Sequence, residues 1–144
     1  MSTQFDNVAI SSNCIDGATT YAVPCPSNNC HPYLCITSNN PQEWLVITVT
    51  GYSVNKVVVY NRIDGNCNAD GCQSRINNAK LLYSYDFAGT SIIHQASFGT
   101  TASLTYTFDF STTTYVRIQQ TTSEHINLVE VEMYYNNVKV PLSG

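Results

Sequence analysis

The sequence predicts an all-β fold, an antiparallel β sandwich that forms a single domain over residues 1–144. Short runs rich in Val, Ile, Thr, Tyr and Phe recur along the 144 residues, and Gly, Asn, Asp and Pro separate them. Within several of these runs apolar and polar side chains alternate, which is typical of strands with one face on a core and the other toward solvent. We identify no helix, internal repeat or linker, and the length suits one domain with a substantial core.

Six segments carry this pattern, and we predict a strand in each of them. In chain order they are Glu43–Thr50, Asn55–Asn61, Ala79–Phe87, Ala102–Phe110, Thr114–Gln120 and Asn127–Tyr135. Their density along the chain favours a sandwich or a barrel.

The first three segments differ in their apolar pattern. In “EWLVITVT” the side chains of Leu45, Ile47 and Val49 share one face, and we expect Trp44 to bury against the opposite sheet. The second segment, “NKVVVYN”, is a continuous apolar run, which is typical of a central strand. Gly51 marks a turn between these two strands. The third segment, “AKLLYSYDF”, is another run rich in Leu and Tyr.

The last three segments alternate most clearly. The alternation predicts an inward set of Tyr106, Phe108, Phe110, Val116, Ile118, Val129, Val131 and Met133. It places on the opposite, polar face Thr105, Thr107, Asp109, Arg117, Glu130 and Glu132. Such strict alternation predicts which side chains form the core between the two sheets.

Charge is scarce and slightly negative, which excludes several classes of partner. Only 11% of the residues are charged, and the formal net charge is -4. We therefore predict no nucleic-acid partner, because phosphates favour clustered Lys and Arg, and no polybasic membrane patch. No apolar run approaches the roughly 20 residues that span a bilayer, so we predict no transmembrane segment.

The composition predicts a location outside the cell or on the surface of a particle such as a virion. A surface dominated by Ser, Thr, Asn and Gln is common on secreted, adhesive and virion-exposed proteins. The first segment, “MSTQFDNVAI”, has no basic stretch followed by an apolar run, so we predict no signal peptide in this chain. The sequence carries no nucleophile elbow, paired catalytic carboxylates, zincin helix or phosphate loop, and we predict that the protein is not an enzyme.

The six cysteines favour disulfides, because their number is even and the domain is small and polar. We expect Cys67 and Cys72 to form one bridge, since they lie close together in one loop. The other four, which allow three connectivities that sequence does not resolve, are Cys14, Cys25, Cys30 and Cys35. An alternative is a zinc site that uses three of these four with His31, but the second cysteine pair of a structural zinc signature is missing.

Five motifs in order resemble those of the discoidin family, also called the factor V/VIII C-type or galactose-binding-like jelly-roll sandwich. They are “NVAIS”, “NCIDG”, “EWLVITV”, “VVVYNRID” and “TYVRIQQTTSEHINLVEVEMY”, and together they cover nearly the whole chain. Within that family the chain is most similar to the F-type lectins, or fucolectins. The resemblance implies a module that binds fucose or a related neutral sugar on glycans or glycoproteins.

The resemblance also implies which residues bind the sugar. Fucolectins use an Arg-x-Asp followed by a second basic residue, which correspond here to Arg62, Asp64 and Arg75. The family's histidine position falls within “CITS”, so Thr37 stands there and His31 is the nearest substitute. A guanidinium presents several donors in one rigid plane, which suits vicinal hydroxyl groups, and a carboxylate can hold it in place.

Members of this family often bind a structural calcium ion. The matching positions are Asn13, through its backbone carbonyl, Asp16 and Glu130. Calcium prefers six to eight oxygen ligands, which include carboxylates and carbonyls. The family's late cysteine is Val129 here, so the bridge that it makes in relatives is not expected.

We hold one alternative function beside the lectin hypothesis. The same sandwich can serve as a structural or adhesive surface protein, with a degenerate sugar site and assembly into a homo-oligomer. Recognition of phospholipid, as in some family members, would need exposed apolar loop tips. The loops here are mostly Asn, Gly, Asp and Ser.

Overall fold

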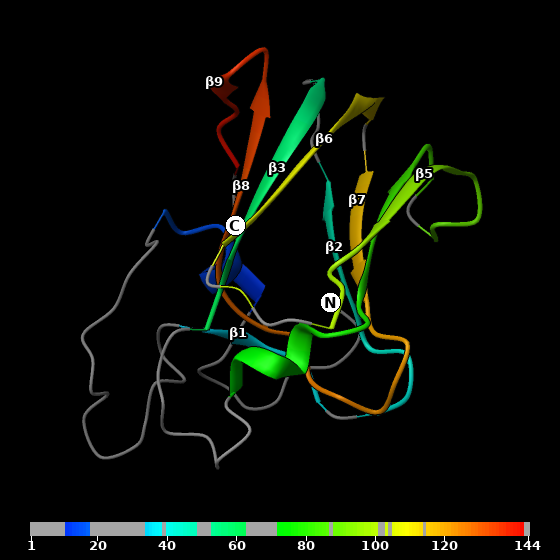
Figure 1. The fold of residues 1–144 in the computed structure, drawn as a ribbon. Coiled ribbons are helices and arrows are strands. Elements are labelled where there is room, and N and C mark those ends of the chain that lie inside the picture. Colours follow the sequence, from blue (N-terminus) through cyan, green and yellow to red (C-terminus); the bar gives the residue numbers. More distant parts are fainter. Residues whose placement is uncertain are drawn as a thin grey trace.

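In the computed structural model the chain forms two antiparallel β-sheets that face each other (Figure 1). The structure describes residues 11–17, 34–38, 40–48, 53–62, 72–86, 88–100, 103, 105–113 and 115–142. Each of the six predicted segments overlaps a strand, and the predicted all-β sandwich is confirmed. No helix in the described part of the chain is long and apolar enough to cross a membrane.

The two sheets divide the strands unequally. The five-stranded sheet has the order β1-β8-β3-β6, with β9 paired to β8. Its strands are β1 (Cys35–Ile36), β3 (Val54–Asn61), β6 (Thr105–Thr113), β8 (Asn127–Tyr135) and β9 (Val138–Lys139). The four-stranded sheet, in the order β2-β7-β4-β5, consists of β2 (Trp44–Thr48), β4 (Lys80–Ser84), β5 (Ile92–Ser97) and β7 (Tyr115–Gln119). Two short 3-10 helices, η1 (Ser11–Cys14) and η4 (Cys72–Ile76), complete the described elements.

The core lies between the two sheets and follows the predicted alternation. The inward side chains of the five-stranded sheet include Val57, Val59, Val131 and Met133. Those of the four-stranded sheet include Leu45, Ile47, Leu81, Tyr83, Val116 and Ile118. Burial of each such side chain contributes about 1.5–3 kcal/mol. Because β3 lies between β8 and β6, the continuous apolar run does form an interior strand.

One prediction for β8 is wrong, and a bulge explains it. The register between β3 and β8 shifts between Tyr60 and Asn61. Below the shift Leu128 joins the core, whereas Val129 packs in a separate cluster with Leu34 and Ile36. An irregularity of one residue moves a side chain to the other face of the sheet, which strict alternation cannot anticipate.

The prediction that Trp44 buries against the opposite sheet is also wrong. Leu45 and Ile47 occupy the inward face of β2, so their neighbour Trp44 points outward. There it is half-buried, and the guanidinium carbon of Arg117 lies 4.5 Å from its ring centroid. The aromatic ring therefore belongs to the outer face of the four-stranded sheet.

Candidate functional site

A buried asparagine fixes the end of β3 against η4. The Asn61 side chain is fully buried, and its Nδ2 donates to the carbonyl oxygens of Gln73 and Ser103 at 2.9 Å each. Its Oδ1 accepts from the backbone N–H of Arg62, also at 2.9 Å. Arg62 therefore follows directly after a residue that is held rigidly. The same residue, Asn61, ties η4, which carries Arg75, to the end of β3.

The two arginines differ in exposure. Arg62 is buried, with 5% of its surface exposed. The Arg75 side chain is 33% exposed, and its Nε lies 4.0 Å from Oε2 of Glu124, itself 51% exposed. Such a solvated pair is worth at most about 1 kcal/mol, so a ligand can displace it at small cost. Asp64, the predicted partner of Arg62, lies outside the described residues.

A second buried amide connects η4 to the loop between β7 and β8. Gln120 is 1% exposed, and its Nε2 donates to the carbonyl oxygen of Arg75 and, at 3.2 Å, to that of His125. Its backbone N–H donates to the carbonyl of Glu43 at 2.9 Å. Sequence reasoning missed Gln120, although it has the same parity as the buried Val116 and Ile118 and so continues their inward face.

Thr37, the residue that follows β1, contacts the same loop. Its Oγ1 accepts from the backbone N–H of Ile126 at 2.9 Å and donates to the Ser38 carbonyl at 3.1 Å. The Nδ1 of His125 lies 2.6 Å from the carbonyl oxygen of Thr37. His125 is half-buried in this contact. Thr37 is itself buried, so within the described structure its hydroxyl holds the loop.

These hydrogen bonds gather several predicted ligand residues at one end of the sandwich. Figure 1 shows η4 and β1 together at its lower end, where the connection after β7 also turns. Thr37, Arg62 and Arg75 are brought there, together with His125 and Gln120, which the sequence did not suggest. The predicted ligand His31 lies outside the described residues.

One disulfide connects η1 to β1 beside this region. Cys14 and Cys35 are bonded, with their Cα atoms 5.3 Å apart, which selects one of the pairings that the sequence left open. Their sequence separation of 21 residues corresponds to a loop-entropy gain of about 3 kcal/mol in the chain-entropy account. Cys72 is also disulfide-bonded. Cys67, Cys25 and Cys30 lie outside the described residues, so the bridge between Cys67 and Cys72 stays a prediction.

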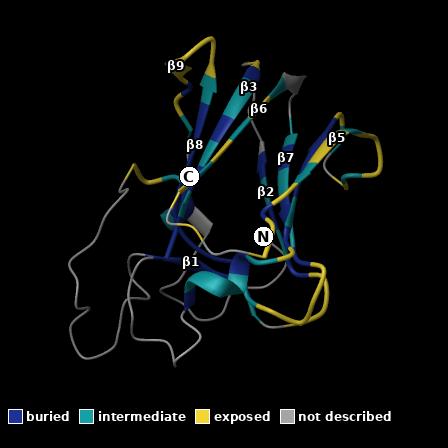
Figure 2. Cartoon of the chain, in the orientation of Figure 1, coloured by how far each residue is buried: buried dark blue, intermediate teal, exposed yellow. Residues whose placement is uncertain are grey.

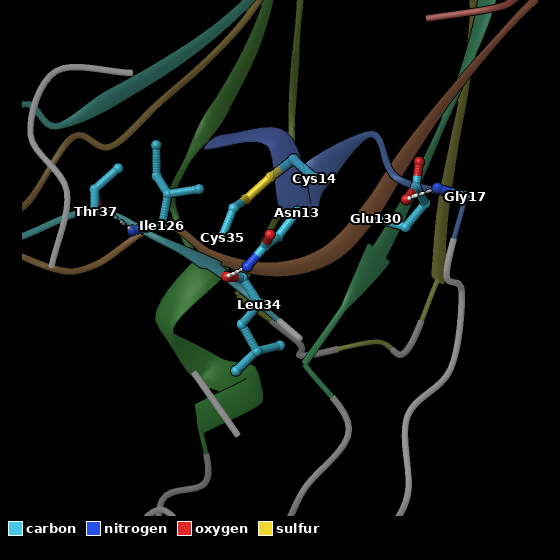
Figure 3. The surroundings of a disulfide bond; sticks show 8 residues. All are labelled: Asn13, Cys14, Gly17, Leu34, Cys35, Thr37, Ile126 and Glu130. Atoms are coloured by element: carbon cyan, nitrogen blue, oxygen red, sulfur yellow. Dashed lines mark hydrogen bonds between the residues drawn. A yellow bond between two sulfur atoms is a disulfide. The ribbon is translucent and has the colours of Figure 1, made fainter. Parts of the chain in front are cut away.

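On the other side of this disulfide lies an acidic pair. Figure 3 shows the bridge between the Thr37–Ile126 contact and the contact of Gly17 with Glu130. The N–H of Gly17 donates to Oε2 of Glu130 at 2.9 Å. Burial raises the pKa of Glu130 to about 7, and the charge and hydrogen bond of Asp16 add to the effect. Two of the three predicted calcium ligands therefore face each other.

The acidic pair lines a hollow of about 380 Å³ beside η1. Asn13, the third predicted ligand, lies in η1, and its side chain donates to the Leu34 carbonyl at 2.9 Å. No third Asp, Glu, His or Cys joins a metal-binding group within the described ranges. Glu130 is buried and Asp16 is exposed, and their two carboxyl groups form a donor set that a hard cation fits, because its charge would remove their repulsion.

Comparison with known proteins confirms the fold. No family model and no curated protein matches the chain by sequence. Among solved structures, a fucose binding module of Streptococcus pneumoniae matches with a TM-score of 0.73 and 20% identity, over 94% of this chain and 91% of that one. The lectin domain of lectinolysin complexed with Lewis B antigen matches with a TM-score of 0.68 and 18% identity, over 93% and 99%.

A serum F-lectin (fucolectin) from striped bass, Morone saxatilis, also matches, with a TM-score of 0.69 and 19% identity. The match covers 92% of this chain and 44% of that one. The chain thus has the discoidin-like, galactose-binding-like β-sandwich fold that its motifs predicted.

Proposed function

We propose that this protein is a carbohydrate-binding module that holds fucose or a related neutral sugar of a glycan at the Arg62 and Arg75 end of the sandwich. The observation that carries the proposal is the pair of buried amides, Asn61 and Gln120, that fix the two arginine-bearing segments to one another. Binding sites need such preorganisation, since an ordered site loses less entropy when the ligand binds.

The chemistry of this end supports a hydroxyl-rich ligand. Arg75 presents planar N–H donors at the surface, and the imidazole of His125 adds a group that can donate or accept. The three structural relatives named above are, by their own descriptions, a fucose binding module, a lectin domain complexed with Lewis B antigen and a fucolectin. We infer binding rather than catalysis as the role of this chain.

A glycan array followed by calorimetry tests the proposal. We expect fucosylated glycans to bind, and Arg75→Ala to weaken binding at least tenfold, as the loss of charge-assisted hydrogen bonds of about 1.5–3 kcal/mol requires. Lys56→Ala is the matched control and should bind normally, because Lys56 lies near the start of β3 and the arginine end lies at the other end of that strand. Wild-type protein that binds no glycan, or Arg75→Ala with undiminished affinity, would contradict the proposal.

We further propose that Asp16, Glu130 and the backbone carbonyl of Asn13 hold a calcium ion. The ion would supply positive charge between the two carboxylates and so fasten the turn after η1 to β8. In protein stripped with a chelator, added calcium should raise the melting temperature, because a hundredfold excess over Kd adds about 2.7 kcal/mol of stability. Asp16→Ala should abolish the response, and an absence of both heat and melting shift in the wild-type protein would exclude the ion.

A second candidate role is that of a structural or adhesive surface protein, and the burial of Arg62 favours it. A guanidinium with 5% exposure can serve to fasten a strand end rather than to bind a ligand. A stable homo-oligomer by light scattering, combined with silence on a glycan array, would support this role over the lectin. For either role we propose an extracellular or particle-surface location, because the buried Cys14–Cys35 bridge is typical of oxidising environments.

A further inference from the structure

A second hollow, of about 310 Å³, lies on the outer face of the four-stranded sheet. Sheet pairing places its wall residues side by side, with Lys80 opposite Gln119 and Leu82 opposite Gln95. Leu81 and Ile118 alternate with these residues and point into the core, so the hollow faces away from it. Its volume is within the range of small-molecule sites, roughly 300–1,000 Å³.

Several polar side chains around this hollow have no partner within the described structure. The Lys80 ammonium has neither an ion pair nor a hydrogen bond with any residue in the described ranges, and the side-chain amides of Gln42 and Gln95 have no hydrogen bond there. The chain has ten acidic residues and six basic ones, so a basic side chain has many potential partners. An ammonium among unengaged amides is therefore placed to bind a group from outside the protein.

A neighbouring residue, Arg117, fixes the orientation of the Gln119 amide. The Nε of Arg117 donates to Oε1 of Gln119 at 2.9 Å, while the guanidinium lies over the ring of Trp44. The β4–β5 loop closes on this side chain, because a Cβ added to Gly89 would lie 3.1 Å from Cδ of Arg117. With its oxygen occupied, Gln119 has its N–H₂ to offer, and the hollow gains a fixed donor beside Lys80.

We propose that this hollow binds an acidic sugar unit, independently of the arginine end of the sandwich. The Lys80 ammonium would pair with the carboxylate or sulfate of the sugar, and the amides of Gln42, Gln95 and Gln119 would bind its hydroxyl groups. The side chains of Leu82 and Ile92, which also line the hollow, offer an apolar surface to the C–H groups of the ring. A net charge of -4 disfavours longer polyanions such as nucleic acid, so one or a few acidic sugars are the ligand that fits.

The probe is a short oligogalacturonate, and the matched neutral probe is its methyl ester. We expect the acid to bind in calorimetry, the ester to bind much more weakly, and added salt to reduce the affinity. Lys80→Gln should weaken binding of the acid at least tenfold, whereas Lys80→Arg should retain it. Lys56→Gln makes the same charge change on the other sheet and should leave the affinity within about twofold.

A sulfated neutral oligosaccharide of the same length separates the two anionic groups. Binding of either acidic probe with the stated dependence on Lys80 supports the proposal. No binding of either probe to the folded wild-type protein would overturn it. Equal losses in Lys80→Gln and Lys56→Gln would also overturn it, because the effect would then come from net charge rather than from this hollow.

Discussion

The outer faces of the two sheets differ in how their charges are paired. On the five-stranded sheet, Oε2 of Glu132 accepts from the hydroxyls of Tyr60 and Tyr134 at 2.8 Å each, and its Oε1 accepts from Lys139 at 2.5 Å. Lys56 lies 4.7 Å above the ring of Tyr134. On the four-stranded sheet neither Lys80 nor Arg117 has an acidic partner among the described residues.

We call the outer face of the five-stranded sheet the closed face, because its charged groups bind each other, and that of the four-stranded sheet the open face. A face whose polar groups bind each other contributes stability and has little to offer a ligand. A face whose cations lack acidic partners gains little stability from them, but retains their capacity to bind. Figure 2 shows β8 as mostly buried and β5, at the edge of the other sheet, as largely exposed.

The largest effect that the comparison predicts is the loss of Glu132. Burial would raise the pKa of this carboxyl group, but hydrogen bonds from Lys139, Tyr134 and Tyr60 hold it below its ordinary value. In Glu132→Gln the size is kept and the charge is lost, so we expect about 2 kcal/mol of destabilisation in urea unfolding. Lys80→Gln on the open face should change stability by less than about 0.5 kcal/mol.

Equal losses of stability in Glu132→Gln and Lys80→Gln would contradict the division into closed and open faces. The pKa gives a second check. Because the folded pKa is lowered, Glu132 contributes stability above its unfolded value of about 4.3, and this contribution is lost as the pH falls through the folded value. Glu132→Gln should therefore unfold with a weaker dependence on acid pH than the wild-type protein.

An intermediate effect is expected at the Arg117–Trp44 stack. A partly desolvated cation over an aromatic ring is worth about 0.5–2 kcal/mol, and the arginine stem also packs on the sheet. Arg117→Ala should therefore cost about 1 kcal/mol. Trp44 is the single tryptophan, so its emission should shift to the red as the ring gains water. Arg117→Lys, which keeps a cation near the ring, should retain part of both signals, and an unchanged emission in Arg117→Ala would contradict the stack.

Sequence reasoning predicted the strands that alternate strictly or form apolar runs, and it missed β5, which does neither. The predicted bounds of Asn127–Tyr135 match β8, because the core faces one side of that strand along most of its length. β5 was missed, since its sequence, “IIHQAS”, belongs to an exposed edge strand and carries no alternation. The outward position of Trp44 follows from its neighbours' burial, which outweighed the general tendency of tryptophan to bury.

The candidate site was predictable only in part, for a physical reason. The resemblance to fucolectins pointed to Arg62 and Arg75 because both lie in or beside one short motif. His125 and Thr37 are separated by 88 residues, so no local pattern relates them. Gln120 could have been suspected from its inward parity, but a polar residue at that position is also compatible with a strand that has simply ended.

The smallest predicted effect concerns Asp86, which closes the β4–β5 loop beside the open face. Its carboxylate accepts from the backbone N–H of Thr90 at 3.1 Å and of Ser91 at 2.6 Å. These hydrogen bonds lower the pKa of Asp86 to about 2. Stability of the loop from this source is therefore present above the unfolded value of about 3.9 and is lost as the pH falls through about 2.

Hydrogen exchange measures this effect where it arises. In Asp86→Asn the amides of Thr90 and Ser91 should exchange faster than in the wild-type protein, while the amides of β8 stay unchanged. Because the carboxylate is exposed, global unfolding should hardly respond. Since the loop contacts Arg117 through Gly89, a loosened loop should also weaken the fixed orientation of Gln119. Unchanged exchange at both amides would show that the loop is held by other contacts and that the open face does not depend on it.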